Sequence, residues 1–279
     1  MDIRYLELVE ILSTQGFFLR NGVCPEIDQR HESWKFELDY GSNVWVKFEK
    51  SHSVFAGIER EASALFQLQG IASVPEIIAS GSLKDSTPYL VTKDFPSNEM
   101  NSSDETTFQS VSDSLHQFSL CKIDIQEIPG TDHLFSLKPN IPMIISSIME
   151  TESLFSLREM INFIDTGTIM DEPSVLIHGS FTPNNVLISN DKGVCLIDLE
   201  AIRYGPLSFD IATMAGAMIE DGEIGAATEW INIATEGLSK RGYVNKINGW
   251  LIIRLLNRAV NGVVSSAERK FYENYFNAH

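Results

Sequence analysis

The sequence has no apolar run of about 18 residues, which is the length that a membrane-spanning helix requires. The N-terminal segment MDIRYLELVEILSTQGFF mixes acidic with apolar residues, and it lacks the basic stretch and uninterrupted apolar core of a secretory signal. The three cysteines, Cys24, Cys121 and Cys195, fit neither a metal-binding spacing nor an even disulfide framework. We therefore expect a cytoplasmic protein with reduced thiols.

Basic residues are also scarce: the sequence has 21 Lys and Arg but 38 Asp and Glu, which gives a formal charge of −17. Nucleic-acid binding needs Lys and Arg to neutralise phosphates, so this charge argues against a nucleic-acid partner. An acidic surface can attract a cationic small molecule, although many proteins are acidic for solubility alone. The 279 residues, 43% of them apolar, suffice for one large domain or two lobes.

Residues 175–200 hold the pattern with the most chemical content. The apolar run 175–177 leads into a polar loop that begins at His178. Two more short apolar runs, 186–188 and 194–197, are separated by small polar residues, which predicts a β-hairpin. A tight hairpin brings Asn185, which precedes it, close to Asp198, which follows it. Their amide and carboxylate oxygens suit a Mg²⁺ ion that remains partly bound to phosphates.

This arrangement resembles the aminoglycoside phosphotransferase and choline kinase family, small-molecule relatives of the protein kinases. The elements that carry the resemblance are His178-Gly179-Ser180, Asn185, Ile197-Asp198 and Phe209-Asp210-Ile211-Ala212. The one departure is that Ser180 occupies the place of the family's catalytic Asp. The resemblance covers about residues 28–215, and the remaining C-terminal helices carry no readable motif.

The resemblance implies an α+β, bilobal, protein-kinase-like fold. Residues 1–95 would form a small nucleotide-binding lobe with an antiparallel sheet, and residues 96–279 a largely helical lobe with the catalytic loop and the substrate site. Periodicity predicts helices near residues 1–19, 53–69, 111–118, 141–148, 154–164, 210–240 and 246–276, and strands within 26–50, 74–81 and 89–92. The polar stretch 97–107 is predicted to be a loop between the lobes.

Several residues of the smaller lobe are implied to bind ATP or GTP. Lys47 would hold the phosphates and Glu61 would pair with it. Residues 29–33 would fold over the phosphates, with Ser33 offering its hydroxyl. A hinge at residues 93–96, after the strand that ends at Thr92, would meet the adenine edge; we include Thr92, Lys93 and Asp94 among the cofactor-binding residues. Without this context, Lys47 and Glu61 would be read as ordinary surface charges.

The chemistry turns on Ser180. The Asp at this position orients the acceptor hydroxyl and takes its proton, a role that contributes ~10² to 10⁴ in rate. A serine hydroxyl can orient an alcohol but is far too weak a base. Phosphoryl transfer depends mostly on positioning and charge neutralisation, so the loss slows the reaction without forbidding it. We count His178 with Ser180 among the catalytic residues, as the side chain that braces the loop. The resemblance further implies that Asp210 has a structural role, accepting hydrogen bonds from the loop backbone.

Three functional hypotheses follow. The first is a Mg²⁺-dependent phosphotransferase acting on a hydroxyl of a small molecule such as an amino sugar or antibiotic; an acidic substrate or a second carboxylate would restore what Ser180 lacks. The second is a pseudokinase that binds a nucleotide or a protein partner, and an engineered Asp-to-Ser change would give the same sequence. The third, a hydrolase using Ser180, lacks the flanking glycines of a nucleophile elbow.

Overall fold

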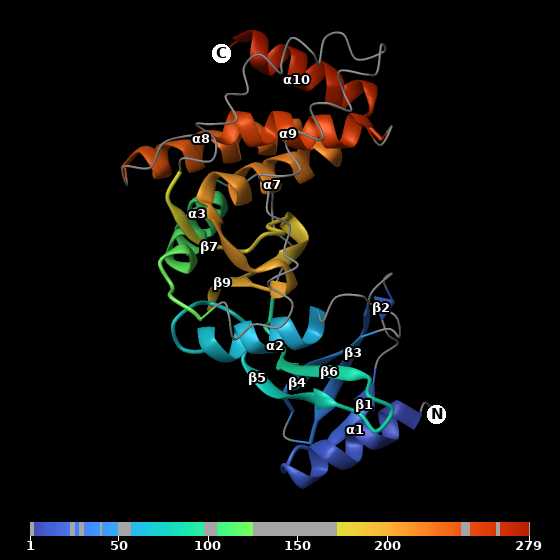
Figure 1. Cartoon of the computed structure of the whole chain (residues 1–279). Helices are drawn as coiled ribbons and strands as arrows, with labels where there is room; N and C mark the ends of the chain where they lie inside the picture. Colours follow the sequence, from blue (N-terminus) through green and yellow to red (C-terminus); the bar gives the residue numbers. More distant parts are fainter. Residues whose placement is uncertain are drawn as a thin grey trace. The chain divides into compact units, whose positions relative to one another are not determined.

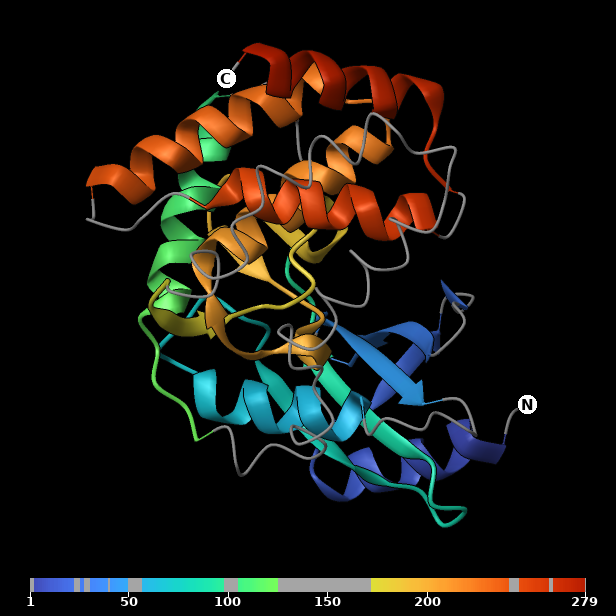
Figure 2. The same cartoon turned by 45° about the horizontal axis from the view of Figure 1, so that its top comes forward.

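In the computed structural model, the described residues are 3–22, 26–27, 31–39, 41–49, 57–97, 105–124, 172–240, 246–260 and 263–278. They divide into two compact units. The first holds the described residues up to 97 together with 121–124 and 187–202, and the second holds 105–120, 172–186 and 203–278. Figures 1 and 2 show the elements of each unit in two views. A single boundary after residue 95 stays a prediction.

The first unit is built on an antiparallel sheet with the strand order β1-β3-β4-β6-β5, in which β2 also pairs with β3. Its strands are β1 (Leu19–Gly22), β2 (Glu26–Ile27), β3 (His31–Leu38), β4 (Asn43–Glu49), β5 (Ile77–Ser82) and β6 (Pro88–Lys93). The α-helices of its described residues are α1 (Ile3–Thr14) and α2 (Gly57–Leu68).

Alternation along β4 decides which residues enter the core of this unit. Val44, Val46 and Phe48 are buried in a cluster that also contains Leu8 and Leu12 of α1. Successive side chains of a strand point to opposite faces, so Lys47 lies on the other face of the sheet. The same alternation therefore places an apolar core on one face and the lysine on the other.

A short hairpin of β8 (Val186–Ser189) and β9 (Gly193–Leu196) leads to the 3₁₀ turn η5 (Leu199–Ala201). Gly193 closes its turn with a φ of +76°, a conformation that glycine adopts without strain. Strand β9 is held from outside the hairpin, because the backbone N–H of Leu196 donates to the carbonyl of Ser73 at 2.9 Å. The Ser73 hydroxyl donates to the carbonyl of Val194 as well. These bonds fix the strand from which Asp198 follows.

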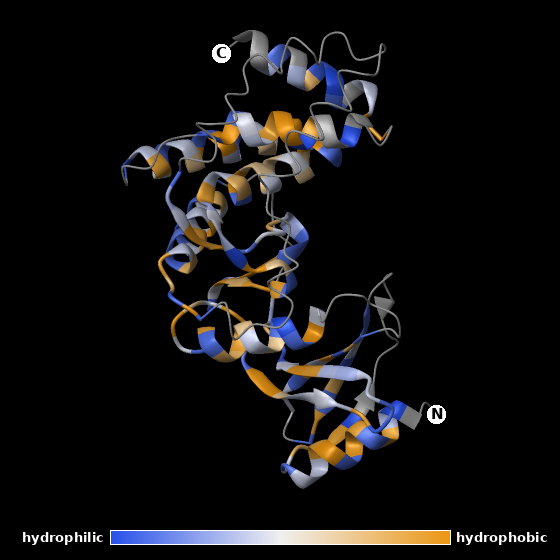
Figure 3. Ribbon diagram, viewed as in Figure 1, coloured by the Kyte–Doolittle hydropathy of each residue, from blue (hydrophilic) through white to orange (hydrophobic). Residues whose placement is uncertain are grey.

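The second unit is mostly helical. Its elements are α3 (Glu105–Ser119), β7 (Ser174–Ile177), η4 (Pro183–Asn185), β10 (Arg203–Pro206), α7 (Leu207–Glu220), α8 (Ile224–Lys240), α9 (Ile247–Val260) and α10 (Ser266–Ala278). β7 and β10 pair antiparallel. Helix α7 packs against both α8 and α9, and apolar residues are frequent along it in Figure 3. Trp230 of α8 is fully buried and donates its Nε1 hydrogen to the carbonyl of Ile211 at 3.0 Å.

The predicted α+β fold with an antiparallel sheet and a helical second part is confirmed. Two local predictions are wrong. Residues His31 to Ser33 are not a loop but the start of β3, because they pair with β4. Residues 105–107 begin α3 rather than ending a loop. The helices predicted at 141–148 and 154–164, and residues 28–30 and 98–104, lie outside the described residues.

Within the described ranges, no helix combines the length and the apolar character needed to cross a membrane.

Candidate functional site

Lys47 is the centre of a charged cluster in the first unit. The strand register places it opposite Ser33 of β3 and Leu90 of β6, so these three side chains share one face of the sheet. Its Nζ donates to Glu61 Oε2 at 2.7 Å and to Asp198 Oδ1 at 2.8 Å. A strand, a helix and the segment after the hairpin therefore converge on one ammonium group.

The electrostatics of this cluster keep the lysine charged. Burial alone would lower the pKa of Lys47, but the carboxylates of Glu61, Asp198 and Glu200 raise it above its ordinary value. Burial raises the pKa of Glu61, and the charge of Lys47 opposes that rise. The Glu61 side chain is only 5% exposed, so its pairing with Lys47 offsets the desolvation of both groups.

Glu200 is a member of the cluster that sequence reasoning missed. Its Oε1 lies 2.8 Å from His31 Nε2 and 3.9 Å from Lys47 Nζ. Its backbone carbonyl accepts a hydrogen bond from Arg60 Nη1 at 3.0 Å. The available signal was its position two residues after Asp198, since a tight turn there brings both carboxylates into one region.

The carboxylates of Glu61, Asp198 and Glu200 offer oxygens that lie within 4.8 Å of one another. Asp198 takes a left-handed conformation with φ 63° before η5, a strained backbone state for a residue other than glycine. Hard oxygen ligands of this kind match the preference of Mg²⁺. The donor set therefore fits the ion that the resemblance implies.

Asn185 belongs to the second unit, whereas Asp198 belongs to the first. The amide nitrogen of Asn185 donates to the carbonyl of Ser180 at 2.8 Å, which leaves the amide oxygen as the possible metal ligand. A metal site shared by Asn185 and Asp198 stays a prediction.

The loop at residues 178–180 is held by Asp210 of α7. Asp210 accepts the backbone N–H of His178 at 2.6 Å and that of Gly179 at 2.9 Å. Gly179 has a φ of +81°, which favours glycine at this position. Burial raises the pKa of Asp210, while His178, the two N–H bonds and Arg203 oppose the rise. The partly buried Ser180 thus follows a rigidly anchored turn.

His178 is fully buried and lies between aromatic rings. Its ring is 6.4 Å from that of Phe118 and 5.8 Å from that of Phe181, measured between centroids. The Nδ1 atom accepts a long hydrogen bond of 3.4 Å from the backbone N–H of Ser180. This environment suits a residue that supports the loop rather than one that reacts with substrate.

The first two backbone N–H groups of the predicted hinge after Thr92 are hydrogen-bonded to carbonyl groups of the same unit. Lys93 N–H donates to the carbonyl of Glu76 at 2.8 Å, and Asp94 N–H donates to the carbonyl of Asn43 at 2.9 Å. These two donors are therefore engaged. An adenine edge would have to meet carbonyl groups of this segment or N–H groups after Asp94.

The Asp94 side chain is engaged as well. Its carboxylate accepts a hydrogen bond from Trp45 Nε1 at 2.7 Å and lies 2.8 Å from Lys35 Nζ. The residue thus ties β3, β4 and the end of β6 together. Its side chain is held by the sheet rather than presented to a ligand.

Comparisons with known proteins identify the fold. A model of the phosphotransferase enzyme family matches residues 154–239. The GDP complex of aminoglycoside 2'-phosphotransferase-IIIa aligns with a TM-score of 0.66 at 13% identity, covering 98% of this chain and 97% of that one. The chain has the aminoglycoside phosphotransferase fold. The macrolide 2'-phosphotransferase MphH from Brachybacterium faecium shares this fold at a TM-score of 0.64 and 13% identity, covering 94% of this chain and 95% of that one.

The ADP-bound aminoglycoside phosphotransferase APH(2'')-Ib also shares the aminoglycoside phosphotransferase fold, with a TM-score of 0.60 at 14% identity, covering 98% of this chain and 91% of that one. A comparison with curated proteins gave no match. The kinase-like fold that the resemblance predicted is confirmed, and the family model agrees with it over residues 154–239.

Proposed function

We propose that this chain is a small-molecule kinase, which transfers the γ-phosphoryl group of ATP or GTP to a hydroxyl group. The observation that carries the proposal is the position of Lys47, whose Nζ lies 2.7 Å from Glu61 Oε2 and 2.8 Å from Asp198 Oδ1. A lysine held by a helix glutamate is the group that positions nucleotide phosphates in kinases. Asp198 beside it offers a carboxylate for the accompanying cation.

Mg²⁺ is the cation that this proposal requires. Asp198 and Asn185 would hold it, whereas the neighbouring Glu61 pairs with Lys47 and Glu200 lies against His31. The ion, when bound, neutralises charge on the phosphates. Lys47 supplies a fixed positive charge of the protein itself, and Glu61 keeps that charge in place.

Ser180 would orient the acceptor hydroxyl by hydrogen bonding. Asp210 fixes the turn before Ser180 by accepting the N–H groups of His178 and Gly179. Because the turn is already ordered, little further conformational entropy is lost when Ser180 orients the acceptor. Because serine cannot act as a general base, we expect turnover ~10² to 10⁴ slower than with a carboxylate at this position. The change Ser180→Asp should therefore raise the rate of ADP release with a good acceptor.

The acceptor class is proposed from the relatives. Solved structures with this fold include complexes of such enzymes with kanamycin, streptomycin and spectinomycin. These ligands are hydroxylated small molecules. We propose that the present chain also acts on a hydroxylated metabolite or antibiotic.

The test is nucleotide binding, measured as the thermal stability of the purified chain with ATP and GTP, with and without Mg²⁺. A ligand at 100 times its Kd adds ~2.7 kcal/mol to the unfolding free energy, which a thermal shift resolves. We expect Mg²⁺-dependent stabilisation that is lost in Asp198→Ala. The matched control is Asp191→Ala, which removes an exposed carboxylate from the turn of the same hairpin.

If neither ATP nor GTP stabilises the chain, with or without Mg²⁺, the proposal is refuted. Equal stabilisation of the wild type and Asp198→Ala would refute the assigned role of Asp198.

A further inference from the structure

Phe209, in the first turn of α7, is contacted by two side chains that each have a buried donor without an acceptor among the described residues. The guanidinium carbon of Arg203 lies 4.9 Å from the centre of the Phe209 ring. The Trp250 ring meets it edge to face at 5.2 Å and 89°. Arg203 Nε and Trp250 Nε1 are both buried, and neither has a hydrogen-bond partner within the part of the chain that the structure describes.

Burying such donors without an acceptor is unfavourable, and it is more so for a charged group. Burial lowers the pKa of Arg203, and only Asp210 opposes this effect. Asp210 already accepts two backbone N–H groups of the catalytic loop, and no hydrogen bond joins it to Arg203 among the described residues. Among the described residues, the region around Phe209 therefore has more donors and positive charge than acceptors to match them.

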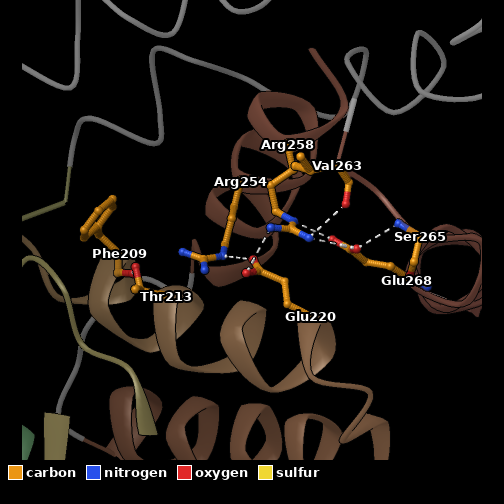
Figure 4. Close-up of polar contacts among 8 residues, drawn as sticks. All are labelled: Phe209, Thr213, Glu220, Arg254, Arg258, Val263, Ser265 and Glu268. Carbon is orange, nitrogen blue, oxygen red and sulfur yellow. Dashed lines mark hydrogen bonds and ion pairs between the residues drawn. The ribbon is translucent and has the colours of Figure 1, made fainter. Parts of the chain in front are cut away.

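Arg254 adds a third donor group to this region. It lies one helical turn after Trp250 on α9, and its Nε lies 2.6 Å from Glu220 Oε1. Figure 4 shows its two terminal nitrogens turned away from Glu220, on the side where Phe209 lies. These nitrogens make no hydrogen bond to any residue that the structure describes. The Glu220 contact thus orients the guanidinium without using its terminal donors.

Arg258, one turn later on α9, shows what a fully paired arginine looks like in this unit. Its Nε lies 2.8 Å from Glu268 Oε1, its Nη2 donates to the Val263 carbonyl at 3.1 Å, and its Nη1 lies 3.2 Å from Glu220 Oε2. Figure 4 shows both arginines on one side of α7. The two arginines of α9 therefore differ in their contacts. All three nitrogens of the Arg258 guanidinium have partners, whereas Arg254 uses its Nε and keeps its terminal nitrogens for another ligand.

We infer that Arg203 and Arg254 form an oxyanion-binding site beside Phe209, which takes a carboxylate, phosphate or sulfate group of the acceptor substrate. This inference rests on the proposed function. The site lies in the same unit as the catalytic loop, because Asp210, the neighbour of Phe209, holds His178 and Gly179. Guanidinium groups bind oxyanions through paired N–H donors, and Trp250 Nε1 supplies a neutral donor nearby. The substrate is therefore an anionic alcohol rather than the cationic one suggested by the net charge.

The experiment measures anion binding to the purified chain without nucleotide. Sulfate, phosphate and acetate are titrated calorimetrically at constant ionic strength set with chloride, using the wild type, Arg203→Gln and Arg254→Gln. We expect saturable binding that is at least about tenfold weaker in each variant, as the loss of a charge-assisted pair predicts. Stronger binding of acetate indicates a substrate carboxylate, whereas stronger binding of phosphate indicates a phosphate group.

The control is Lys240→Gln, which removes one positive charge from an exposed lysine whose ion pair, within the described ranges, is with Glu236 on its own helix. Its anion affinity should equal that of the wild type. If Arg203→Gln does not fold, Arg203→Lys keeps the charge but loses the planar fork, and it should also weaken binding.

Equal anion affinity in all variants, or no saturable binding by the wild type, would overturn the inference. Because nucleotide is absent, this failure differs from failure of the proposed function, which appears as a lack of nucleotide stabilisation.

Discussion

Gly216→Ala is expected to destabilise the protein although it places alanine, the best helix former, inside a helix. A Cβ at Gly216 would lie 2.3 Å from Arg254 Cδ and 2.5 Å from Arg254 Nε. Ordinary contacts between carbon atoms are about 3.5–4.0 Å, so the Arg254 side chain must move by more than about 1 Å. Such a movement takes its Nε, now 2.6 Å from Glu220 Oε1, out of hydrogen-bonding range.

Two terms of opposite sign decide the outcome. The higher helix propensity of alanine adds about 1 kcal/mol to the unfolding free energy. Loss of a charge-assisted hydrogen bond removes about 1.5–3 kcal/mol. The Arg254 side chain is 30% exposed and that of Glu220 is 19% exposed, so solvent screens part of this loss. The net effect is therefore a destabilisation of less than about 2 kcal/mol.

The sign should reverse when Arg254 is removed. Arg254→Ala removes the three atoms that lie nearest the new methyl group, so in this background Gly216→Ala should stabilise by about 1 kcal/mol. Urea unfolding of the four proteins of this double-mutant cycle measures the coupling. If Gly216→Ala stabilises the wild type as much as the Arg254→Ala variant, the claim that glycine makes room for the arginine is wrong.

Two further substitutions test local features of the fold. Ser265→Ala removes the hydroxyl that accepts the N–H of Glu268 at 3.1 Å, and it should lower the unfolding free energy by about 1 kcal/mol in urea unfolding while Ser265→Thr does not. Burial raises the pKa of Cys195 from 9.0 to about 12, so the folded chain retains a proton that the unfolded chain loses. Stability should therefore fall between pH 9 and 12, at up to ~1.4 kcal/mol per pH unit, and Cys195→Ala should show a shallower fall in unfolding experiments across this range.

The sequence predicts those parts of the fold in which the spacing of apolar residues and the residues of the adjoining turns indicate the same structure. Alternating apolar residues on both sides of Lys47 give β4, and the small polar residues before Gly193 give the β8–β9 hairpin. The stretch near His31 misleads, since a run of polar and charged residues looks like a loop. His31 is nevertheless buried, with 5% of its surface exposed, and it pairs with Glu200. Glu200 lies about 170 residues further along the chain. A pairing over that distance leaves no local signal.

The site follows the same rule. Lys47 and Asp198 are found through a motif, and each also makes short contacts in the structure. Arg203 and Arg254 belong to no motif, and the importance of Arg203 depends on its buried Nε having no acceptor among the described residues. An unsatisfied donor is a property of the packed structure, so it cannot be predicted from residue type or spacing.

The net charge of −17 and the proposed anionic substrate are compatible because they act over different distances. The field of exposed acids is screened beyond about 8 Å at physiological ionic strength, so it affects the rate of encounter more than the bound state. Selection occurs at contact, where Arg203 and Arg254 offer donors that a cationic substrate cannot use. An ammonium group would add like charge beside two guanidinium groups and leave their donors unpaired. The acidic surface therefore slows the approach of the anion, while the local donors decide which substrate stays bound.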